Sequence, residues 1–294
     1  ASMLFWRAIN VELWLRVYFG DRRGRALTKE SVPSFTAYGD EFTARAAGTE
    51  DAARLLASHT PNPSRHLFIV AGSSRVTYAR IPVRTPLVNA GDDIQTVVQK
   101  ALVDYDVRAG DTVVVSEKAV AVSQGRSFPV AQVRVSPFAR LLVRFVGKSA
   151  VGIGLGIPET MQLAIEEVGV ARILLAAIVA AVTRPFGIRG MFYRVAGPSA
   201  RAVDGPTPGT LPPYNTHAKK APADPAGVAR RLADVLSASA GGRVSAAVID
   251  ANDIGANILG ASEDVDEGLI AELFADNPLG QGLQQTPVAL IRRV

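Results

Sequence analysis

Apolar residues recur along this chain at two spacings, and each spacing predicts a different element of secondary structure. Apolar runs of strand length occur at His66–Ala71, Ala79–Thr85, Asp111–Ser116, Met191–Ala196, Ser245–Ile249 and Pro287–Ile291. Apolar residues three or four positions apart predict helices at residues 4–19, 50–58, 94–105, 158–169, 171–183, 224–237 and 267–274. Helices and strands are interspersed without a regular strand–helix–strand repeat. The pattern therefore predicts a mixed α/β fold.

Capping residues support several of these helix assignments. Thr49 is placed to cap the helix at residues 50–58, and either Asp92 or Asp93 is placed to cap the helix that runs through Tyr105. Pro225 falls in the first turn of its predicted helix, where a missing N–H costs nothing. Between two such elements, residues 204–214 form a long loop rich in proline and glycine, and its length suggests function or mobility.

The quality of the pattern changes near residue 75. Before that point the periodicity is weak, and Pro61-Asn62-Pro63 breaks the chain. We interpret residues 1–75 as an N-terminal extension or small subdomain, or a lid. Residues 76–294 carry the sharper pattern and are predicted to form one domain.

Composition narrows the chemistry. There is no cysteine, which excludes disulfides, zinc–thiolate sites, iron–sulfur clusters and cysteine nucleophiles. The chain has three histidines, so a bound metal is expected to have oxygen ligands, which suits magnesium or manganese. The apolar runs are too short to span a bilayer, so we expect a soluble, cytoplasmic protein without a membrane partner.

Charge is distributed unevenly. The net charge is +5, yet no acidic residue occurs from Lys118 to Pro158 or from Arg172 to Val203, and acidic residues gather after residue 250. A fold that joins these regions would hold phosphates on one side and a cation on the other; ordinary solvated charge is the alternative. Aromatic residues make up 6% of the chain, too few beside the basic segments for base stacking, so nucleic acid is not expected as a partner.

The strongest local signal is an apolar strand that ends in a carboxylate. Residues 246–249 are apolar, and Asp250 and then Asp253 follow them. In open α/β sheets ligands collect at the carboxyl ends of strands, where a carboxylate can bind a divalent cation that bridges phosphate oxygens. A plain turn or helix cap remains the alternative.

Two further turns are candidates for ligand contact. One surrounds Gln281 between Gly280 and Gly282, where glycines let a backbone approach a ligand closely. The other begins at Asp204. For both, an ordinary turn is an open alternative. No P-loop motif and no Gly-x-Ser-x-Gly nucleophile elbow occurs in the chain, so neither of those chemistries is supported.

Taken in order, these turns resemble a known family, the γ-glutamyl ligases of the deazaflavin coenzyme F(420). The resemblance covers about the last 210 residues. It begins at Gly91-Asp92-Asp93, continues through the run from Asp111 to Lys118 and through Gln124-Gly125-Arg126, and ends with Ile249-Asp250-Ala251 and Gly280-Gln281 before the final strand.

The resemblance implies a mixed α/β ligase fold with mixed sheets and an intertwined homodimer. It also implies GTP, or ATP in its place, with Mg²⁺ or Mn²⁺, an acyl phosphate formed on a small-molecule carboxylate, and attack by the amine of glutamate. The residues that it assigns are Lys118 and Asp250 to catalysis, Gly91, Asp92, Lys118, Arg126 and Gln281 to the nucleotide, and Asp204, Asp250 and Asp253 to the metal.

The chain also departs from the family pattern. Where the family has Glu-Thr-Arg-His-Gly, this chain has Phe186-Gly187-Ile188-Arg189-Gly190, and the family's Asn-Ala-Gly-Ile-Asp is replaced at residues 195–199. Asp204 therefore stands in for the family's aspartate only across an insertion. Two hypotheses follow: a divergent amide ligase whose substrate the sequence does not name, and a non-catalytic homologue that has lost the metal site.

Overall fold

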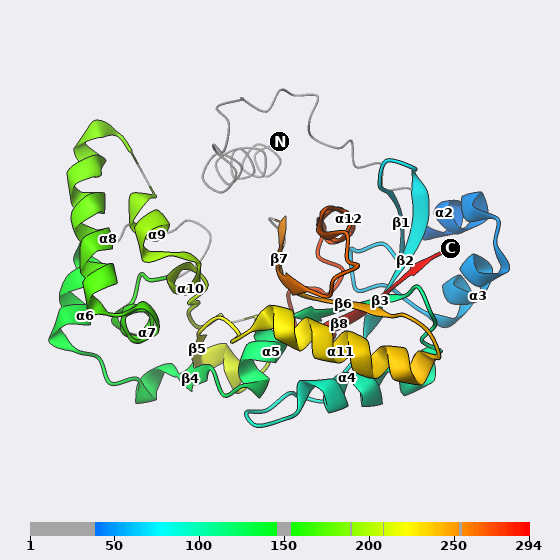
Figure 1. Ribbon diagram of the computed structural model, residues 1–294, viewed down its shortest axis with the longest axis horizontal. Helices are drawn as coiled ribbons and strands as arrows, with labels where there is room; N and C mark the ends of the chain where they lie inside the picture. Colours follow the sequence, from blue (N-terminus) through cyan, green and yellow to red (C-terminus); the bar gives the residue numbers. More distant parts are fainter. Residues whose placement is uncertain (1–38, 146–153, 189, 208, 253–254) are drawn as a thin grey trace.

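The computed structural model describes residues 39–145, 154–188, 190–207, 209–252 and 255–294. Figure 1 shows two parts, a region built on a β-sheet and a smaller region built from helices alone. We call them the sheet lobe and the helical lobe. The helix predicted at residues 4–19 lies outside the described residues.

The sheet lobe is organised around a six-stranded sheet with the order β1-β2-β8-β3-β6-β7. Neighbouring strands are antiparallel except β3 and β6, which are parallel, so the sheet is mixed and the predicted α/β class is confirmed. The strands span β1 Phe68–Ala71, β2 Val76–Val83, β3 Thr112–Ser116, β6 Ser245–Asn252, β7 Gly255–Ala261 and β8 Val288–Arg293.

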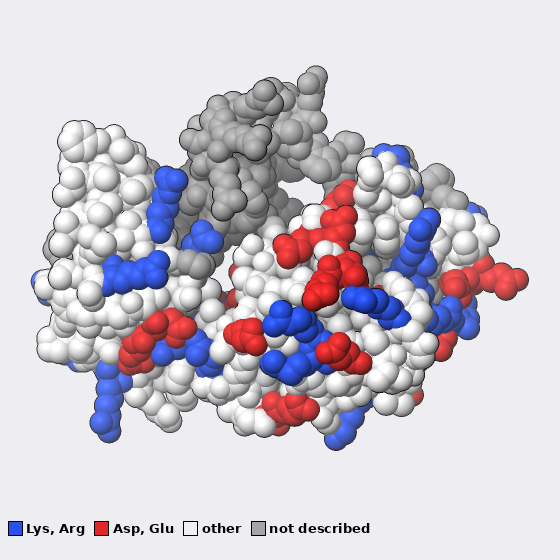
Figure 2. Space-filling model, in the orientation of Figure 1, with Lys and Arg blue, Asp and Glu red and all other residues white. Residues whose placement is uncertain are grey.

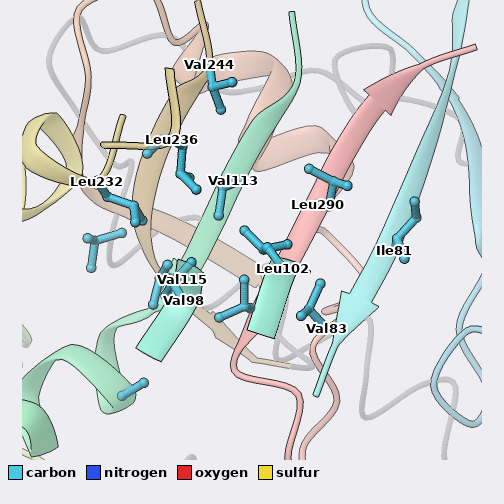
Figure 3. Packing of buried hydrophobic residues seen from close by; sticks show 14 of the residues in the cluster. Ile81, Val83, Val98, Leu102, Val113, Val115, Leu232, Leu236, Val244 and Leu290 are labelled. Carbon is cyan, nitrogen blue, oxygen red and sulfur yellow. The ribbon is translucent and has the colours of Figure 1, made fainter. Parts of the chain in front are cut away.

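Each central strand divides its side chains between two cores, because successive residues of a strand point to opposite faces. Val113 and Val115 of β3 belong to one apolar cluster, and Val114 between them belongs to the other. Figure 3 shows the first cluster, in which Leu290 of β8 lies beside the valines of β3. Since both faces are covered, the central strands are continuous apolar runs, which is why the sequence predicted them.

Helices cover both faces of the sheet. The first face carries α4 (Ile94–Leu102) and α11 (Pro225–Ala240), and α12 (Glu267–Leu273) lies on the other side. Each begins with an aspartate whose side chain accepts a hydrogen bond from a backbone N–H of the first turn: Asp93, Asp224 and Asp266. The helices α2 (Asp40–Ala47) and α3 (Glu50–Ser58) also pack against the first cluster, and Thr49 caps α3 as predicted.

The helical lobe has an apolar core of its own. It contains α6 Pro137–Leu142, α7 Pro158–Val168, α8 Val170–Thr183, α9 Met191–Ala196 and α10 Pro198–Arg201. Its buried centre includes Met161, Leu163 and Ile173. Among the described residues no helix is long and apolar enough to cross a membrane.

A short two-stranded ribbon lies between the lobes. It pairs β4 (Ser127–Pro129) with β5 (His217–Lys219), and β4 follows the helix α5 (Glu117–Ser123). Charged contacts reinforce this junction, because Arg126 and Lys220, which flank the ribbon, pair with Glu167 and Glu166 of α7. Short 3-10 turns complete the fold at Val103–Tyr105, Val130–Gln132, Val143–Phe145, Arg184–Phe186 and Tyr214–Thr216.

One predicted element is wrong, because residues Met191–Ala196 form the helix α9 and not a strand. In a strand, Phe192, Arg194 and Ala196 would share one face. In the helix, Phe192 and Ala196 lie one turn apart and are buried in the lobe core, while Arg194 turns outward. Packing against α8 therefore overrides the strand preference of this aromatic and β-branched segment.

The segment before residue 76 contributes to the sheet lobe in its described part. Phe68 of β1 and Leu55 of α3 lie in the same apolar cluster as Val113 and Leu290. The division of the chain at residue 75 stays a prediction.

Candidate functional site

A cavity of about 210 Å³ opens where β3 and β6 end and β8 begins. The start of α5, the loop before Tyr214 and the turn that precedes β8 form its walls. Apolar and polar side chains both line it, and the polar ones include Thr85, Ser116, Lys118, Thr210, Asn277, Gln281, Gln285 and Thr286. The position agrees with the expectation that ligands collect at the carboxyl ends of parallel strands, here β3 and β6.

Lys118 is the cationic group of this cavity. Ser116 caps α5 through a hydrogen bond from Ala119 N, and this places Lys118 in the first helical turn. Its Nζ donates to Thr210 Oγ1 at 3.0 Å, across the cavity wall. Burial lowers the pKa of Lys118, and the nearby carboxylates of Asp204 and Asp250 oppose that change.

Asp204 is held beside Lys118 by the backbone. Its N–H and C=O exchange hydrogen bonds with Lys219 at 3.0 and 2.9 Å, which extends the β4–β5 ribbon by one bridge. The Gly205 N–H donates to Asp204 Oδ1 at 2.9 Å. Burial raises the pKa of the Asp204 carboxyl, as does the charge of Asp250, whereas Lys118 and the Gly205 hydrogen bond favour the charged form.

Asp250 completes a group of alternating charges near the end of β6. It lies opposite Asn257 of β7, and its carboxylate acts electrostatically on Lys118, Lys219 and Asp204. Lys219 is buried and forms an ion pair with Glu117. We call these five residues the charged cluster: Glu117, Lys118, Asp204, Lys219 and Asp250.

Gln281 lies on the opposite side of the cavity, in the turn that leads to β8. The turn is built around Asn277, which has a left-handed backbone (φ 53°) and donates from Nδ2 to Gly280 O at 3.1 Å. Asn62 holds the turn from outside by donating to Pro278 O at 2.8 Å and to Thr286 Oγ1 at 2.9 Å. A residue from the N-terminal segment thus fixes one wall of the cavity.

Gly91 and Asp92 lie next to the cavity without lining it. The Gly91 N–H donates to Ser123 O at 2.9 Å, and Asp92 Oδ2 accepts from Asn89 N at 2.7 Å. Tyr214 connects this turn to the cavity, because it lines the cavity while burial and the charge of Asp92 raise the pKa of its hydroxyl. Asp92 itself borders a separate surface hollow.

Arg126 is another predicted site residue that does not line the cavity. The guanidinium of Arg126 donates to the backbone oxygen of Ala221 and, at 2.6 Å, to Glu167 Oε1 of the helical lobe. Asp253 lies outside the described residues. Of the predicted site residues, Lys118 and Gln281 line the cavity, and Asp204 and Asp250 act electrostatically on Lys118. Arg126 is engaged at the junction between the lobes.

The described residues contain no group of three or more histidine or acidic side chains placed to hold a metal ion. Within the charged cluster, Asp204 and Asp250 are the carboxylates that act electrostatically on Lys118. Sequence reasoning missed Glu117, Lys219 and Thr210. Glu117 is next to the predicted residue Lys118 in the sequence, but Lys219 is far from both. The ion pair between Glu117 and Lys219 becomes visible only in the structure, where the β4–β5 ribbon positions Lys219.

Comparison with known proteins gives one result for the family. A family model described as F420-0:Gamma-glutamyl ligase matches residues 82–258, which is more than half of the chain. This range contains the whole charged cluster. Asn62 and the turn around Gln281 fall outside it. Comparison with curated proteins finds no match.

Proposed function

This chain belongs to the F420-0:Gamma-glutamyl ligase family, and from this we propose its reaction. The protein joins the amine of an amino acid, with glutamate as the first candidate, to a carboxylate of its substrate. The observation that carries the proposal is the position of Lys118. It is half-buried at the wall of a cavity, where the carboxylates of Asp204 and Asp250 act on it electrostatically. A partly buried cation at the carboxyl end of a strand suits the binding of an anionic group.

The reaction proceeds in two steps. A carboxylate oxygen of the substrate attacks the γ-phosphorus of GTP or ATP, and the nucleoside diphosphate leaves with the electron pair of the broken P–O bond. The amine then attacks the carbonyl carbon of the acyl phosphate; inorganic phosphate leaves and the amine loses a proton. Lys118 stabilises the negative charge on the transferring phosphoryl group, which is the main task of a protein in such transfers.

The residues present fit a magnesium or manganese ion in their donor chemistry. Magnesium is usually bound by one or two carboxylates together with substrate phosphates, and does not require a cage made by the protein alone. Asp204 and Asp250 would supply such carboxylates, with Asp253 as a further ligand. The bound ion would neutralise charge on the phosphates. Lys118 would orient the same phosphates from the cavity wall.

The remaining residues take supporting roles in the proposal. Gln281, with a donor and an acceptor in one side chain, contacts the nucleotide or the metal from the opposite wall. The turn at Gly91 and Asp92 contacts the nucleotide beside Tyr214. Arg126 reaches phosphate only after releasing Glu167, so it also couples the two lobes. We further propose a homodimer that acts in the cytoplasm, where nucleoside triphosphates are available.

The test is thermal unfolding of the full chain with GTP or ATP, each with and without Mg²⁺ or Mn²⁺. Specific binding at about 100 times Kd stabilises the folded state by roughly 2.7 kcal/mol. We expect stabilisation only when nucleotide and metal are both present. It should be lost in Lys118→Met and Asp250→Asn, and kept in the matched controls Lys100→Met and Asp264→Asn, whose side chains are exposed.

Turnover is tested by release of inorganic phosphate in the presence of amine acceptors, with glutamate first. Release that depends on the acceptor supports the ligase. If nucleotide and metal together leave the unfolding temperature of a folded sample unchanged, the proposed function is wrong.

A non-catalytic homologue is the second candidate, and one observation favours it. The described residues lack a three-ligand metal group, and the two carboxylates that act electrostatically on Lys118 are those of Asp204 and Asp250. This hypothesis predicts ligand binding without turnover. Acceptor-dependent phosphate release would exclude it.

A further inference from the structure

The outer surface of α8 exposes an unusual number of large apolar side chains. Ten large apolar residues are exposed among the described residues, and seven of them lie between residues 170 and 188. We call them the α8 apolar face: Val170, Leu174, Leu175, Ile178, Val182, Phe186 and Ile188. Exposed apolar patches of this kind mark binding surfaces, because a water-facing surface normally scatters such residues singly.

The spacing on α8 shows that this exposure is one-sided. Positions 170, 174, 178 and 182 recur every fourth residue and so follow one side of the helix. On the opposite side, Ile173 and Ala176 are fully buried in the core of the helical lobe. The helix is therefore apolar on both sides, with protein against one and no described residue covering the other.

The charges around this face have one sign. No acidic residue occurs between Glu167 and Asp204, whereas Arg172, Arg184, Arg194 and Arg201 are exposed there. Arg140 and Arg144, on α6 and the turn after it, are exposed as well. The acidic residues of the lobe lie on α7: Glu166 and Glu167 are paired with Lys220 and Arg126, and Glu159 is half-buried in the first turn. Figure 2 shows this lobe as a largely uncharged surface with separate basic side chains and one acidic group on its lower part.

We propose that the α8 apolar face binds the surface of an anionic lipid bilayer, with α8 lying in the plane of the interface. Two properties of this face suit an anionic bilayer. Its apolar side chains can enter the acyl-chain region, and the lipid phosphates attract the nearby guanidinium groups. A second copy of the chain fits less well, because it would bring the same arginines together.

The geometry fixes the manner of binding. A helix of 14 residues is about 21 Å long, short of the roughly 30 Å of the hydrocarbon core. The buried side of α8 also stays attached to its lobe. The protein therefore rests on the membrane and does not span it. This revises the sequence-based expectation that a membrane is not a partner, and it does not depend on the proposed ligase reaction, because the cavity lies in the sheet lobe.

The experiment is vesicle flotation of the full chain, with vesicles of phosphatidylcholine alone or mixed with phosphatidylglycerol. We expect the protein to float with the mixed vesicles and to dissociate as salt is raised. The double variant Leu175→Gln, Ile178→Gln should lower the bound fraction about tenfold, because two side chains that enter the interface become polar. The control Val103→Gln changes an even more exposed apolar residue of the sheet lobe, and this variant should bind as the unchanged protein does.

A charge variant keeps the proposal testable if the double variant fails to fold. Arg140→Gln, Arg184→Gln should weaken binding to the mixed vesicles by about fivefold for each arginine. Absence of flotation with either vesicle overturns the proposal, as does equal flotation of the unchanged protein and the double variant. So does a dimer in sedimentation velocity that the double variant dissociates, if no lipid is bound, because the face then joins two copies. Nucleotide-dependent stabilisation should be the same in all variants, which separates this test from that of the ligase.

Discussion

In the sheet lobe each central strand contributes side chains to two apolar cores, one on each face of the sheet. The first core alone buries Val113, Val115, Val288 and Leu290. In the helical lobe α8 buries one side and leaves the other outside. The two lobes also differ in where they place charge. The sheet lobe buries the ion pair of Arg292 with Asp111, whereas the exposed charge of the helical lobe is largely arginine.

This difference teaches that the lobes are adapted to different surroundings. A sheet covered on both faces, with its buried charges paired, needs only water around it. A helix that is apolar on both sides needs a second apolar medium or partner. The apolar side chains of the central strands β3 and β8 are therefore buried within the sheet lobe. The exposed apolar side chains of α8 are accounted for by the proposed contact with a lipid bilayer.

The largest expected effect comes from breaking a buried ion pair of the sheet lobe. Asp111 accepts from Arg292 at 2.9 and 2.6 Å, and both side chains are almost fully buried. Asp111→Ala leaves the arginine charge unpaired, which should lower the free energy of unfolding by about 3–5 kcal/mol. Urea unfolding followed by circular dichroism measures it.

The matched control is Asp264→Ala, which breaks the exposed pair with Arg243 and should cost about 0–1 kcal/mol. Similar losses in both variants would contradict the view that burial of charge distinguishes this lobe.

The second effect compares the two sides of α8. Ile173→Ala removes a fully buried side chain and should cost about 2–5 kcal/mol, because a cavity is left behind. Leu174→Ala changes an exposed neighbour and should cost less than about 1 kcal/mol. Chemical unfolding of both variants measures the ratio. A loss at Leu174 as large as that at Ile173 would show that protein covers the outer side in solution.

The third effect concerns the junction. Arg126→Gln removes the contact with Glu167, and hydrogen bonds to charged groups contribute about 1.5–3 kcal/mol when buried. Since both side chains are partly exposed, we expect a loss near 1 kcal/mol. The informative measurement is whether unfolding divides into two transitions, one for each lobe. Glu167→Gln is the matched variant from the other side, and its unfolding curve should agree.

The smallest effect is a pH dependence. Burial lowers the pKa of His217 in the junction ribbon and of His59 in the sheet lobe. The unfolded chain therefore takes up protons more readily near pH 6.5, and stability should fall as the pH is lowered through that value. His217→Gln and His59→Gln should each reduce this fall. Thermal unfolding between about pH 8 and pH 5.5 measures it, and an unchanged slope in both variants would refute the assignment.

Much of the fold could be predicted, since burial leaves a direct imprint on sequence. Strands buried on both faces are apolar runs, which is how residues 111–116 and 245–249 were found. The edge strand β7 was missed, since glycine and asparagine give it no alternation. Its Gly260 has a non-local cause: a Cβ there would lie 2.2 Å from the backbone nitrogen of Ala226 in α11. No local pattern carries that information.

The candidate site was predictable to the same extent. The order of motifs indicated Lys118, Asp204 and Asp250, and the structure brings these three side chains together. It could not indicate Lys219, whose position depends on a backbone bridge to Asp204, or Asn62, which reaches a turn more than two hundred residues away. Arg126 matches the motif by its position in the sequence, yet its guanidinium donates to Glu167 of the helical lobe. Glu167 is distant in the sequence, so the motif could not indicate this pairing.

The position of β8 has a consequence for how the protein is made. This strand lies between β2 and β3, although it is synthesised after every other described strand. Until it is synthesised, β2 and β3 each present an unpaired edge, and the cavity lacks the wall that precedes β8. Such edges invite pairing with other chains. During synthesis the sheet lobe therefore exposes two strand edges until β8 is available to pair with them.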